Sequence, residues 1–78
     1  MIRHATLDDL EQLVALEERC FESDRISRRR FRHLLTRANA STLVAEEGGR
    51  LLGYVLVLFS RGTALARLYS IAVDREAR

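Results

Sequence analysis

All basic side chains of this sequence are arginines, and their type and spacing suggest chemistry more clearly than any other residues. The chain has 13 basic residues, and none of them is a lysine. A guanidinium is planar and permanently charged, and it can hold a carboxylate or phosphate with two parallel hydrogen bonds. Six arginines gather between positions 25 and 37: Arg25, Arg28, Arg29, Arg30, Arg32 and Arg37.

Two kinds of partner would suit this arginine cluster, namely nucleic acid and an acidic protein surface. Stacking aromatic residues are not interleaved with the arginines, because Phe31 fits an apolar helical stripe. We therefore favour the interpretation that the cluster is a solvated helix face. It would be paired in part with Glu17, Glu18 and Glu22, and we do not expect nucleic acid to be a partner.

The histidines and the single cysteine offer little further chemistry. His4 and His33 have no companions at metal-ligand spacing, so the sequence supports no metal site. Cys20 cannot form a disulfide within the chain, which favours a reducing compartment. Its position at the end of an apolar helical stripe favours a buried, unreactive thiol, and we assign it no covalent step.

Length and composition indicate one small globular domain. The chain has 78 residues, 47% hydrophobic content and a net charge of +2, which argues against disorder. Its longest apolar run, Tyr54–Phe59, is far shorter than the roughly 20 residues that a membrane span needs. The N-terminus lacks an apolar signal core. We therefore expect a cytoplasmic protein with no membrane contact.

The apolar period changes from helical to strand-like near Ser41. Before that point, Thr6 with Asp9 matches a capping box, and Ser27 can cap a second helix. The first expected element is a strand at 2–5, followed by helices at about 7–20 and 28–38. Ala38 is the last apolar position of the second helix. Strands are expected at 42–45, 51–59 and 64–73.

These elements predict an α+β fold of order β-α-α-β-β-β, with two helices on an antiparallel four-stranded sheet of order 1-2-3-4. Gly53 interrupts the third strand and suggests a bulge or a close backbone approach. Alternation in the last strand puts Leu65, Tyr69, Ile71 and Val73 on one face, and Ala64, Ala66, Leu68, Ser70 and Ala72 on the other. Both faces are mostly apolar, so we expect both to be covered in the complete fold.

Four stretches carry a resemblance to a known family: Ile2–Leu10, Phe21, Val44–Val55 and Leu68–Arg78. Together they resemble the first half of the GNAT superfamily of acetyl-CoA-dependent N-acetyltransferases. The similarity is greatest to the bacterial branch that includes the ribosomal-protein alanine acetyltransferases. It covers the whole chain but only about half of the family's domain, and the last stretch is the most specific.

The next feature in the family is a glycine-rich loop, Q/R-x-x-G-x-G/A, at a helix N-terminus that binds the pyrophosphate of coenzyme A. Arg78 would be the first, cofactor-binding residue of this motif. The loop glycines, the following helix, the fifth strand and the usual thiolate-protonating tyrosine do not occur in this sequence. We therefore expect residues 1–78 to be a single partial domain with little catalysis and weak coenzyme A affinity when alone.

The resemblance also implies roles in the last strand. The backbone of Ile71, Ala72 and Val73 would lie beside the pantetheine arm of acetyl-CoA, and one N–H group would polarise the thioester carbonyl. Tyr69 would be the catalytic base or a water-orienting group, with a packed aromatic as the simpler interpretation. Substrate-binding residues would be Phe21, Glu22 and Ser70, and the acidic loop around Glu22 would attract a cationic acceptor.

The function that the resemblance implies is transfer of acetyl from acetyl-CoA to a primary amine, by direct attack in a ternary complex. The acceptor is a small molecule, a protein N-terminus or a lysine, and the fold does not decide among them. The alternative is a non-catalytic half-domain that associates with proteins, itself included, through the edge of the fourth strand, or binds nucleic acid through the arginine cluster.

Overall fold

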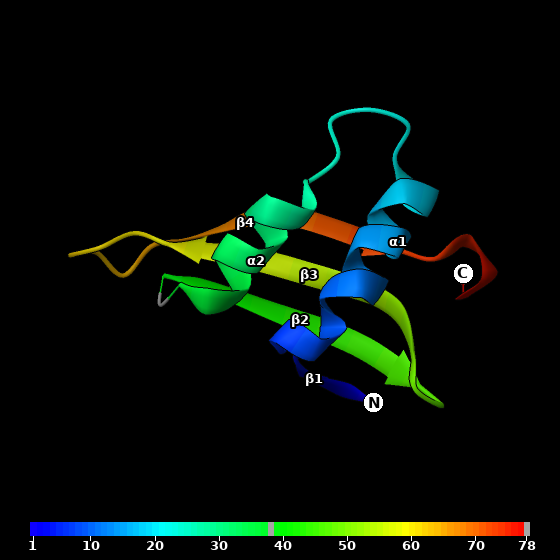
Figure 1. Ribbon diagram of the computed structural model, residues 1–78. Helices are drawn as coiled ribbons and strands as arrows, with labels where there is room; N and C mark the ends of the chain where they lie inside the picture. The colour runs from blue at the N-terminus through cyan, green and yellow to red at the C-terminus, as the bar shows by residue number, and fades with distance from the viewer. Residues whose placement is uncertain (38, 78) are drawn as a thin grey trace.

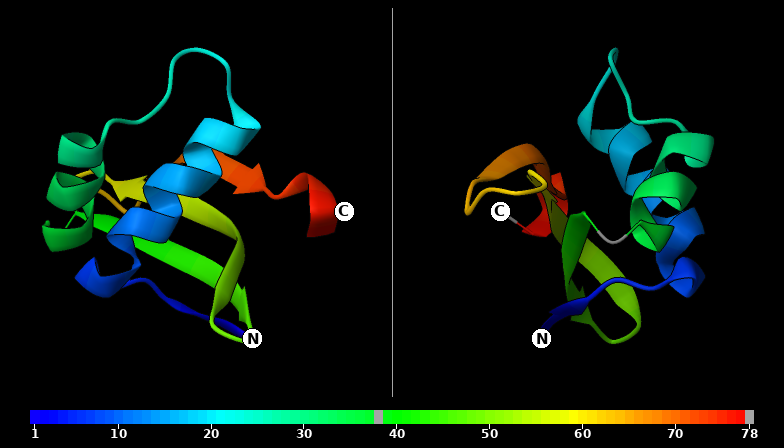
Figure 2. Two further views of the ribbon diagram at one scale, coloured as in Figure 1. Left: turned by 45° about the vertical axis from the view of Figure 1, so that its right-hand side comes forward. Right: turned by 90° about the vertical axis from the view of Figure 1, so that its left-hand side faces the viewer.

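The computed structural model, which describes residues 1–37 and 39–77, contains an antiparallel sheet with strands in the order β1-β2-β3-β4 (Figure 1). The strands are β1 (Ile2–His4), β2 (Ala40–Glu47), β3 (Arg50–Phe59) and β4 (Ala66–Val73). Helices α1 (Leu10–Cys20) and α2 (Arg28–Thr36) lie on one face of this sheet, as Figure 2 shows. Short 3-10 turns, η1 (Leu7–Asp9) and η2 (Arg75–Ala77), precede α1 and follow β4. The predicted fold class and strand order are confirmed.

Side-chain caps fix where the helical segments begin. The Asp9 carboxylate accepts a hydrogen bond from the Thr6 N–H at 2.7 Å, which forms the predicted capping box. The Ser27 hydroxyl accepts from the Arg30 N–H at 3.1 Å, and α2 starts there despite a first turn without acidic residues. α2 ends at Thr36, and the predicted last position, Ala38, lies outside the described residues.

The core lies between the two helices and the sheet. The rings of Phe31 and Tyr54 meet edge to face there, with centroids 5.6 Å apart. Such pairs add about 0.5–1.5 kcal/mol to the burial of their area. The buried apolar residues are Leu10, Leu13 and Leu16 of α1, Phe31 and Leu34 of α2, Val44 of β2, Leu51, Tyr54 and Leu56 of β3, and Ala72 of β4.

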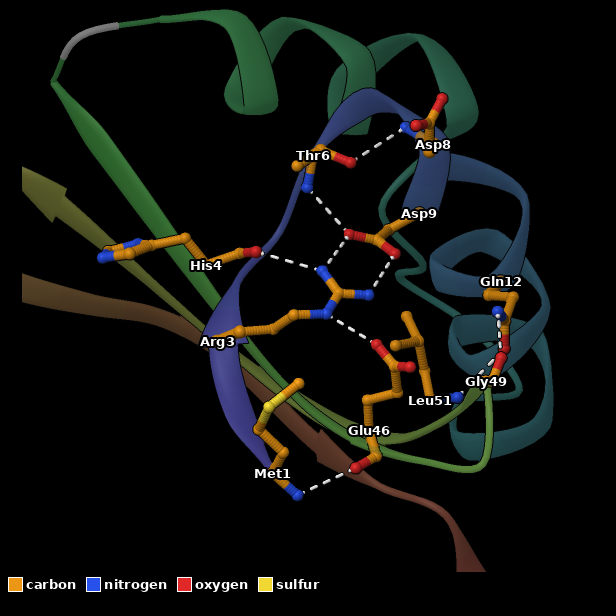
Figure 3. Close-up of polar contacts among 10 residues, drawn as sticks. All are labelled: Met1, Arg3, His4, Thr6, Asp8, Asp9, Gln12, Glu46, Gly49 and Leu51. Atoms are coloured by element: carbon orange, nitrogen blue, oxygen red, sulfur yellow. Dashed lines mark hydrogen bonds and ion pairs between the residues drawn. The ribbon is translucent and has the colours of Figure 1, made fainter.

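A polar cluster ties the N-terminal strand to η1 and β2 (Figure 3). Arg3 donates two hydrogen bonds to the Asp9 carboxylate, both at 2.8 Å, and a third to Glu46 at 2.6 Å. These bonds from Arg3 hold the pKa of Asp9 below its ordinary value of 3.8, against the opposing effect of burial. The side chain of Gln12 binds the β2–β3 hairpin through two hydrogen bonds, one donated to Gly49 O and one accepted from Leu51 N.

A β-bulge in β4 changes which face each side chain occupies. Leu56 pairs with Ser70 whereas the next residue, Val57, pairs with Leu68, so Tyr69 is the extra residue. Cross-strand partners share a face, and Val55, which pairs with Ile71, lies on the same face as Val57. Leu68 therefore faces the same side as Ile71. Ala66, which pairs with Phe59, faces this side as well, so the simple alternation predicted from the sequence was wrong for both Leu68 and Ala66, because one extra residue reverses the pattern.

Gly53 makes the close approach that the sequence suggested. A Cβ atom at this position would lie 2.8 Å from the carbonyl oxygen of Ala72. A second bulge lies beside it, because Ala45 pairs with Gly53 whereas Glu46 pairs with Leu51, which leaves Leu52 as the extra residue. A side chain at position 53 would therefore push β4 away from β3.

The sheet face opposite the helices is apolar and open within the described part of the chain. Ile2, Leu68 and Ile71 are each more than half exposed there. A shallow groove of about 490 Å³ runs over this face, between Ile2, Leu43, Val55, Ile71 and Val73. None of the described helices is long and apolar enough to cross a membrane.

Candidate functional site

The outer edge of β4 carries backbone groups that no described strand pairs. In the observed order, β4 has β3 as its sole neighbour among the described strands. Asp74 N–H, just after the strand, donates to Leu52 O on β3 at 2.8 Å. Backbone groups alternate in direction along an antiparallel strand. By this alternation those of Ile71 and Val73 point to the open edge, whereas those of Ala72 point to β3.

Val73 supports this assignment, because its carbonyl oxygen is 3.5 Å from the Cys20 Sγ, which donates to it from the end of α1. Cys20 is half-buried and free. The side chains of the three predicted cofactor-binding strand residues divide between two environments. Ala72 is buried under the helices, whereas Ile71 and Val73 are exposed on the open face.

Ser70 connects the strand to a buried carboxylate. Its Oγ lies 2.8 Å from the Tyr54 hydroxyl, which donates to Glu17 Oε1 at 2.6 Å. The other carboxylate oxygen, Glu17 Oε2, accepts from Ile26 N at 2.6 Å. Glu17 is only 1% exposed, so the expectation that it would face solvent and pair with the arginine cluster was wrong. Its place in the apolar i, i+3, i+7 series of α1 was the signal that it is buried.

The environment of Tyr54 keeps its hydroxyl protonated. Burial raises the pKa of Tyr54 well above its ordinary value of 10.0, and the hydrogen bond to Glu17 raises it further. Both effects disfavour a tyrosinate, which would be a buried anion beside a carboxylate. The group can therefore donate to Glu17 and accept from Ser70 at the same time, because a hydroxyl has one donor and two acceptor sites.

Tyr69, the residue suggested as a catalytic group, occupies the bulge. Its side chain is 37% exposed, and the guanidinium of Arg30 lies over its ring at 5.6 Å from the centroid. This contact is a cation–π pair between α2 and β4. Among the described hydrogen bonds, the Ser70 hydroxyl joins the network of Glu17, and the Tyr69 hydroxyl has no part in it.

The residues suggested for acceptor binding come from the end of α1. Phe21 is the C-cap of that helix and packs half-buried against the core. Glu22 is exposed in the loop that joins α1 to α2. The suggested cofactor residue Arg78 lies outside the described residues.

Asp74, the residue directly after β4, organises the segment that follows this strand. It is 3% exposed, and Oδ2 accepts from Arg19 at 2.9 Å and from Arg50 at 3.2 Å. The Glu76 N–H donates to the other carboxylate oxygen and is the largest cause of the lowered pKa of Asp74. The sequence signal for this turn was an aspartate directly after a strand, because an aspartate side chain can accept a hydrogen bond from the backbone N–H two residues further on.

The described residues contain no group of three or more histidine, cysteine, aspartate or glutamate side chains that could hold a metal ion. What the site does offer is a strand edge with outward backbone donors and acceptors, next to a hydroxyl connected to a buried carboxylate. This combination can bind an amide-containing chain and can accept a proton beside it.

Comparisons with known proteins agree with this architecture. The family model for the acetyltransferase (GNAT) family matches residues 7–78. The solved structure of the GNAT-like decarboxylase GphF, in complex with isobutyryl-CoA, has a TM-score of 0.89 and 26% identity, and the match covers 100% of this chain and 50% of that one. No curated protein sequence matches the chain.

Two acetyltransferase structures share the fold. The ribosomal-protein-S18-alanine N-acetyltransferase from Escherichia coli has a TM-score of 0.80 and 18% identity, over 97% of this chain and 46% of that one. The ribosomal-protein-alanine N-acetyltransferase from Brucella melitensis has a TM-score of 0.78 and 22% identity, over 100% of this chain and 59% of that one. The chain thus spans about half the length of these relatives.

Proposed function

This chain belongs to the GNAT acetyltransferase family, and we propose that it forms the β4 side of a site where acetyl passes from acetyl-CoA to a primary amine. The observation that carries the proposal is the open edge of β4 beside Ser70, whose hydroxyl leads to the buried Glu17. The acceptor amine would be on a small molecule, a protein N-terminus or a lysine, and it would attack directly in a ternary complex.

The outward backbone groups of Ile71 and Val73 suit a pantetheine arm. That arm contains amides, which can pair with a strand edge as a peptide does. When bound, acyl-CoA supplies the activated thioester carbonyl. A fixed N–H group at the strand edge is the kind of donor that stabilises developing negative charge on such an oxygen. In this proposal Ile71 and Val73 are the groups that hold and orient the arm.

The buried network would receive the proton that the acceptor amine must lose. A primary amine is mostly an ammonium ion near neutral pH and is not nucleophilic until it is deprotonated. Ser70 Oγ would take this proton and pass its own to Tyr54 Oη, which would pass its own to Glu17 Oε1. Each hydroxyl gives one proton and takes one, so only the amine and Glu17 change charge. The high pKa of Tyr54 supports a concerted transfer without a tyrosinate.

We further propose that residues beyond this sequence hold the coenzyme A pyrophosphate. The chain covers about half of its structural relatives. Residues 1–78 would then be a partial domain whose own affinity for acyl-CoA is weak, because the site described above offers mainly an edge for the pantetheine arm. Calorimetry of the chain with acetyl-CoA tests this directly, and micromolar binding by residues 1–78 alone would contradict it.

A second candidate is decarboxylation of a carboxylated acyl-CoA. It is favoured by the similarity to a GNAT-like decarboxylase in complex with isobutyryl-CoA, at 26% identity over all of this chain. The same strand edge would serve both reactions. They differ in their products, because acyl transfer releases the free thiol of coenzyme A, whereas decarboxylation releases carbon dioxide and leaves the thioester intact.

The test is an assay of the protein that carries this chain, with acetyl-CoA and a panel of amines, peptides and lysine-containing proteins. Thiol release that depends on the acceptor, with an acetylated product in the mass spectrum, supports acetyl transfer. Carbon dioxide release from a carboxylated acyl-CoA without thiol release would replace it by the second candidate. Binding to proteins or nucleic acid with neither turnover nor acyl-CoA binding would favour the non-catalytic half-domain.

A further inference from the structure

Charge is strongly segregated along the chain, and one end of the molecule has no acidic residue. All acidic side chains lie at positions 8–24, 46–47 and 74–76, whereas the stretches 27–45 and 48–73 contain none. Those two stretches form α2, most of β2, and β3 and β4 with the hairpin between them. The end of the fold where α2 meets the β3–β4 hairpin therefore contains basic side chains without local counter-charges.

A cleft of about 440 Å³ opens at this end, and we name it the arginine cleft. Three arginines, one histidine and one asparagine provide its charged and polar wall: Arg30, Arg37, Arg61, His33 and Asn39. Leu34, Leu58 and Phe59 provide its apolar surface. Its volume lies within the range of about 300–1,000 Å³ that is typical of small-ligand sites.

The arginines of the cleft belong to the group that has no carboxylate partner within the described residues, a group that also includes Arg25, Arg29, Arg32, Arg67 and Arg75. Arg3, Arg19 and Arg50 form ion pairs with carboxylates, and so does Arg28 with Glu11. Within the described residues, Arg30, Arg37 and Arg61 form no ion pair. Arg30 stacks over Tyr69, and Arg37 Nε approaches His33 Nδ1 at 3.5 Å. These contacts hold the guanidinium groups without neutralising them.

We propose that the arginine cleft binds a small organic anion that carries two or more phosphate or carboxylate groups. Several guanidinium groups around one cavity can each bind an anionic group bidentately, and the absence of nearby acidic residues in the described chain leaves the attraction uncompensated. Leu58 and the 46% exposed Phe59 offer an apolar surface for the carbon skeleton of the ligand.

The arginine cleft is separate from the acyl site proposed above. Phe59 pairs with Ala66 at one end of β4, whereas Gly53 pairs with Val73 at the other. These pairs are six positions apart on β3, which corresponds to about 20 Å along the strand. Ser70 lies nearer, because it pairs with Leu56, three positions from Phe59. No described residue of β4 lines the cleft, so failure of the acyl-transfer proposal would leave the anion site standing.

The test is a nuclear magnetic resonance titration of the isotope-labelled protein with inorganic pyrophosphate and, in a second arm, with citrate. The two arms distinguish phosphate from carboxylate recognition. The proposal predicts saturable shifts centred on the amides of His33, Arg37 and Arg61. Arg37→Gln or Arg61→Gln should weaken binding of the preferred probe by about tenfold or more, the effect of losing one charge-assisted contact.

Arg29→Gln is the matched control, because it removes the same charge from the exposed side of α2 at a residue that does not line the cleft. It should weaken binding less than about twofold. Equal losses for Arg29→Gln and Arg37→Gln would overturn the proposal, since they would indicate general attraction to a basic surface. So would preferential binding of a single-stranded oligonucleotide across α2 with a steep salt dependence.

Discussion

The Tyr54 hydroxyl lies 2.6 Å from the Glu17 carboxylate, and both side chains are buried between α1 and the sheet. This bond links the helix layer to the centre of the sheet, and the contact of Tyr54 with Ser70 extends the link to β4. A buried carboxylate that relies on a hydroxyl and one backbone N–H is sensitive to the loss of either, because it cannot be rehydrated.

Tyr54→Phe should therefore destabilise the fold by about 1–3 kcal/mol, the cost of leaving a buried acceptor without its partner. The ring and its packing against Phe31 remain. Ser70→Ala is the control, and it should cost less than about 1 kcal/mol because the bond between Tyr54 and Glu17 survives. Urea unfolding measures both, and equal midpoints for Tyr54→Phe and the unchanged protein would contradict a stabilising role of the bond.

If the buried network accepts the acceptor's proton, Glu17→Gln should lower kcat for acyl transfer by about 10²–10⁴-fold, the usual contribution of a general base. Without this proton acceptor the rate would depend on the small fraction of acceptor that is already a free amine, so the loss should shrink as pH rises. Glu18→Gln removes the same charge from the neighbouring, exposed position of α1 and should leave the rate unchanged. A kcat in Glu17→Gln equal to that of Glu18→Gln would assign the base elsewhere.

Gly53→Ala should cost about 1–3 kcal/mol, because the added methyl group would meet the backbone oxygen of Ala72 and force β4 outward. Gly48→Ala serves as the comparison: it has open space around it but a positive φ of 60°, so its cost, about 1–2 kcal/mol, comes from backbone conformation alone. Faster hydrogen exchange at the amides of Ala72 and Asp74, which face β3, should appear in Gly53→Ala only, and its absence would show that β4 tolerates the methyl group.

The contact between Arg3 and Asp9 should make the free energy of unfolding decrease at acidic pH. The pKa of Asp9 is lowered in the folded state from 3.8, chiefly by the hydrogen bonds from Arg3. A lowered pKa contributes stability that is complete above the unfolded value and is lost as pH falls through the folded value. Urea midpoints between about pH 6 and pH 2 should therefore fall less steeply for Asp9→Asn than for the unchanged protein. If the urea midpoints of the two proteins depended equally on pH, Asp9 would make no such contribution to stability.

Much of the architecture is predictable from the sequence, because the helix caps, the Gly48–Gly49 turn and the change in apolar period are local signals. The bulge at Tyr69 is not, because register depends on partners that lie far away in the chain. Glu17 was predicted to face solvent because it is charged, although its position in α1 falls within the apolar stripe. Asp74 was missed because its partners, Arg19 and Arg50, are distant in sequence.

The extra residue at Tyr69 also matters for comparing this strand with those of other proteins. Suppose that β4 is aligned without a gap to a strand that has no bulge. On one side of position 69, the alignment would then match residues that lie on opposite faces of the sheet. Deleting Tyr69 would restore regular alternation without moving its neighbours to other faces: Leu68 would still pair with Val57 on the open face, and Ser70 would keep its bond to Tyr54. Loss of this one codon would therefore straighten the strand without exchanging its exposed and buried side chains.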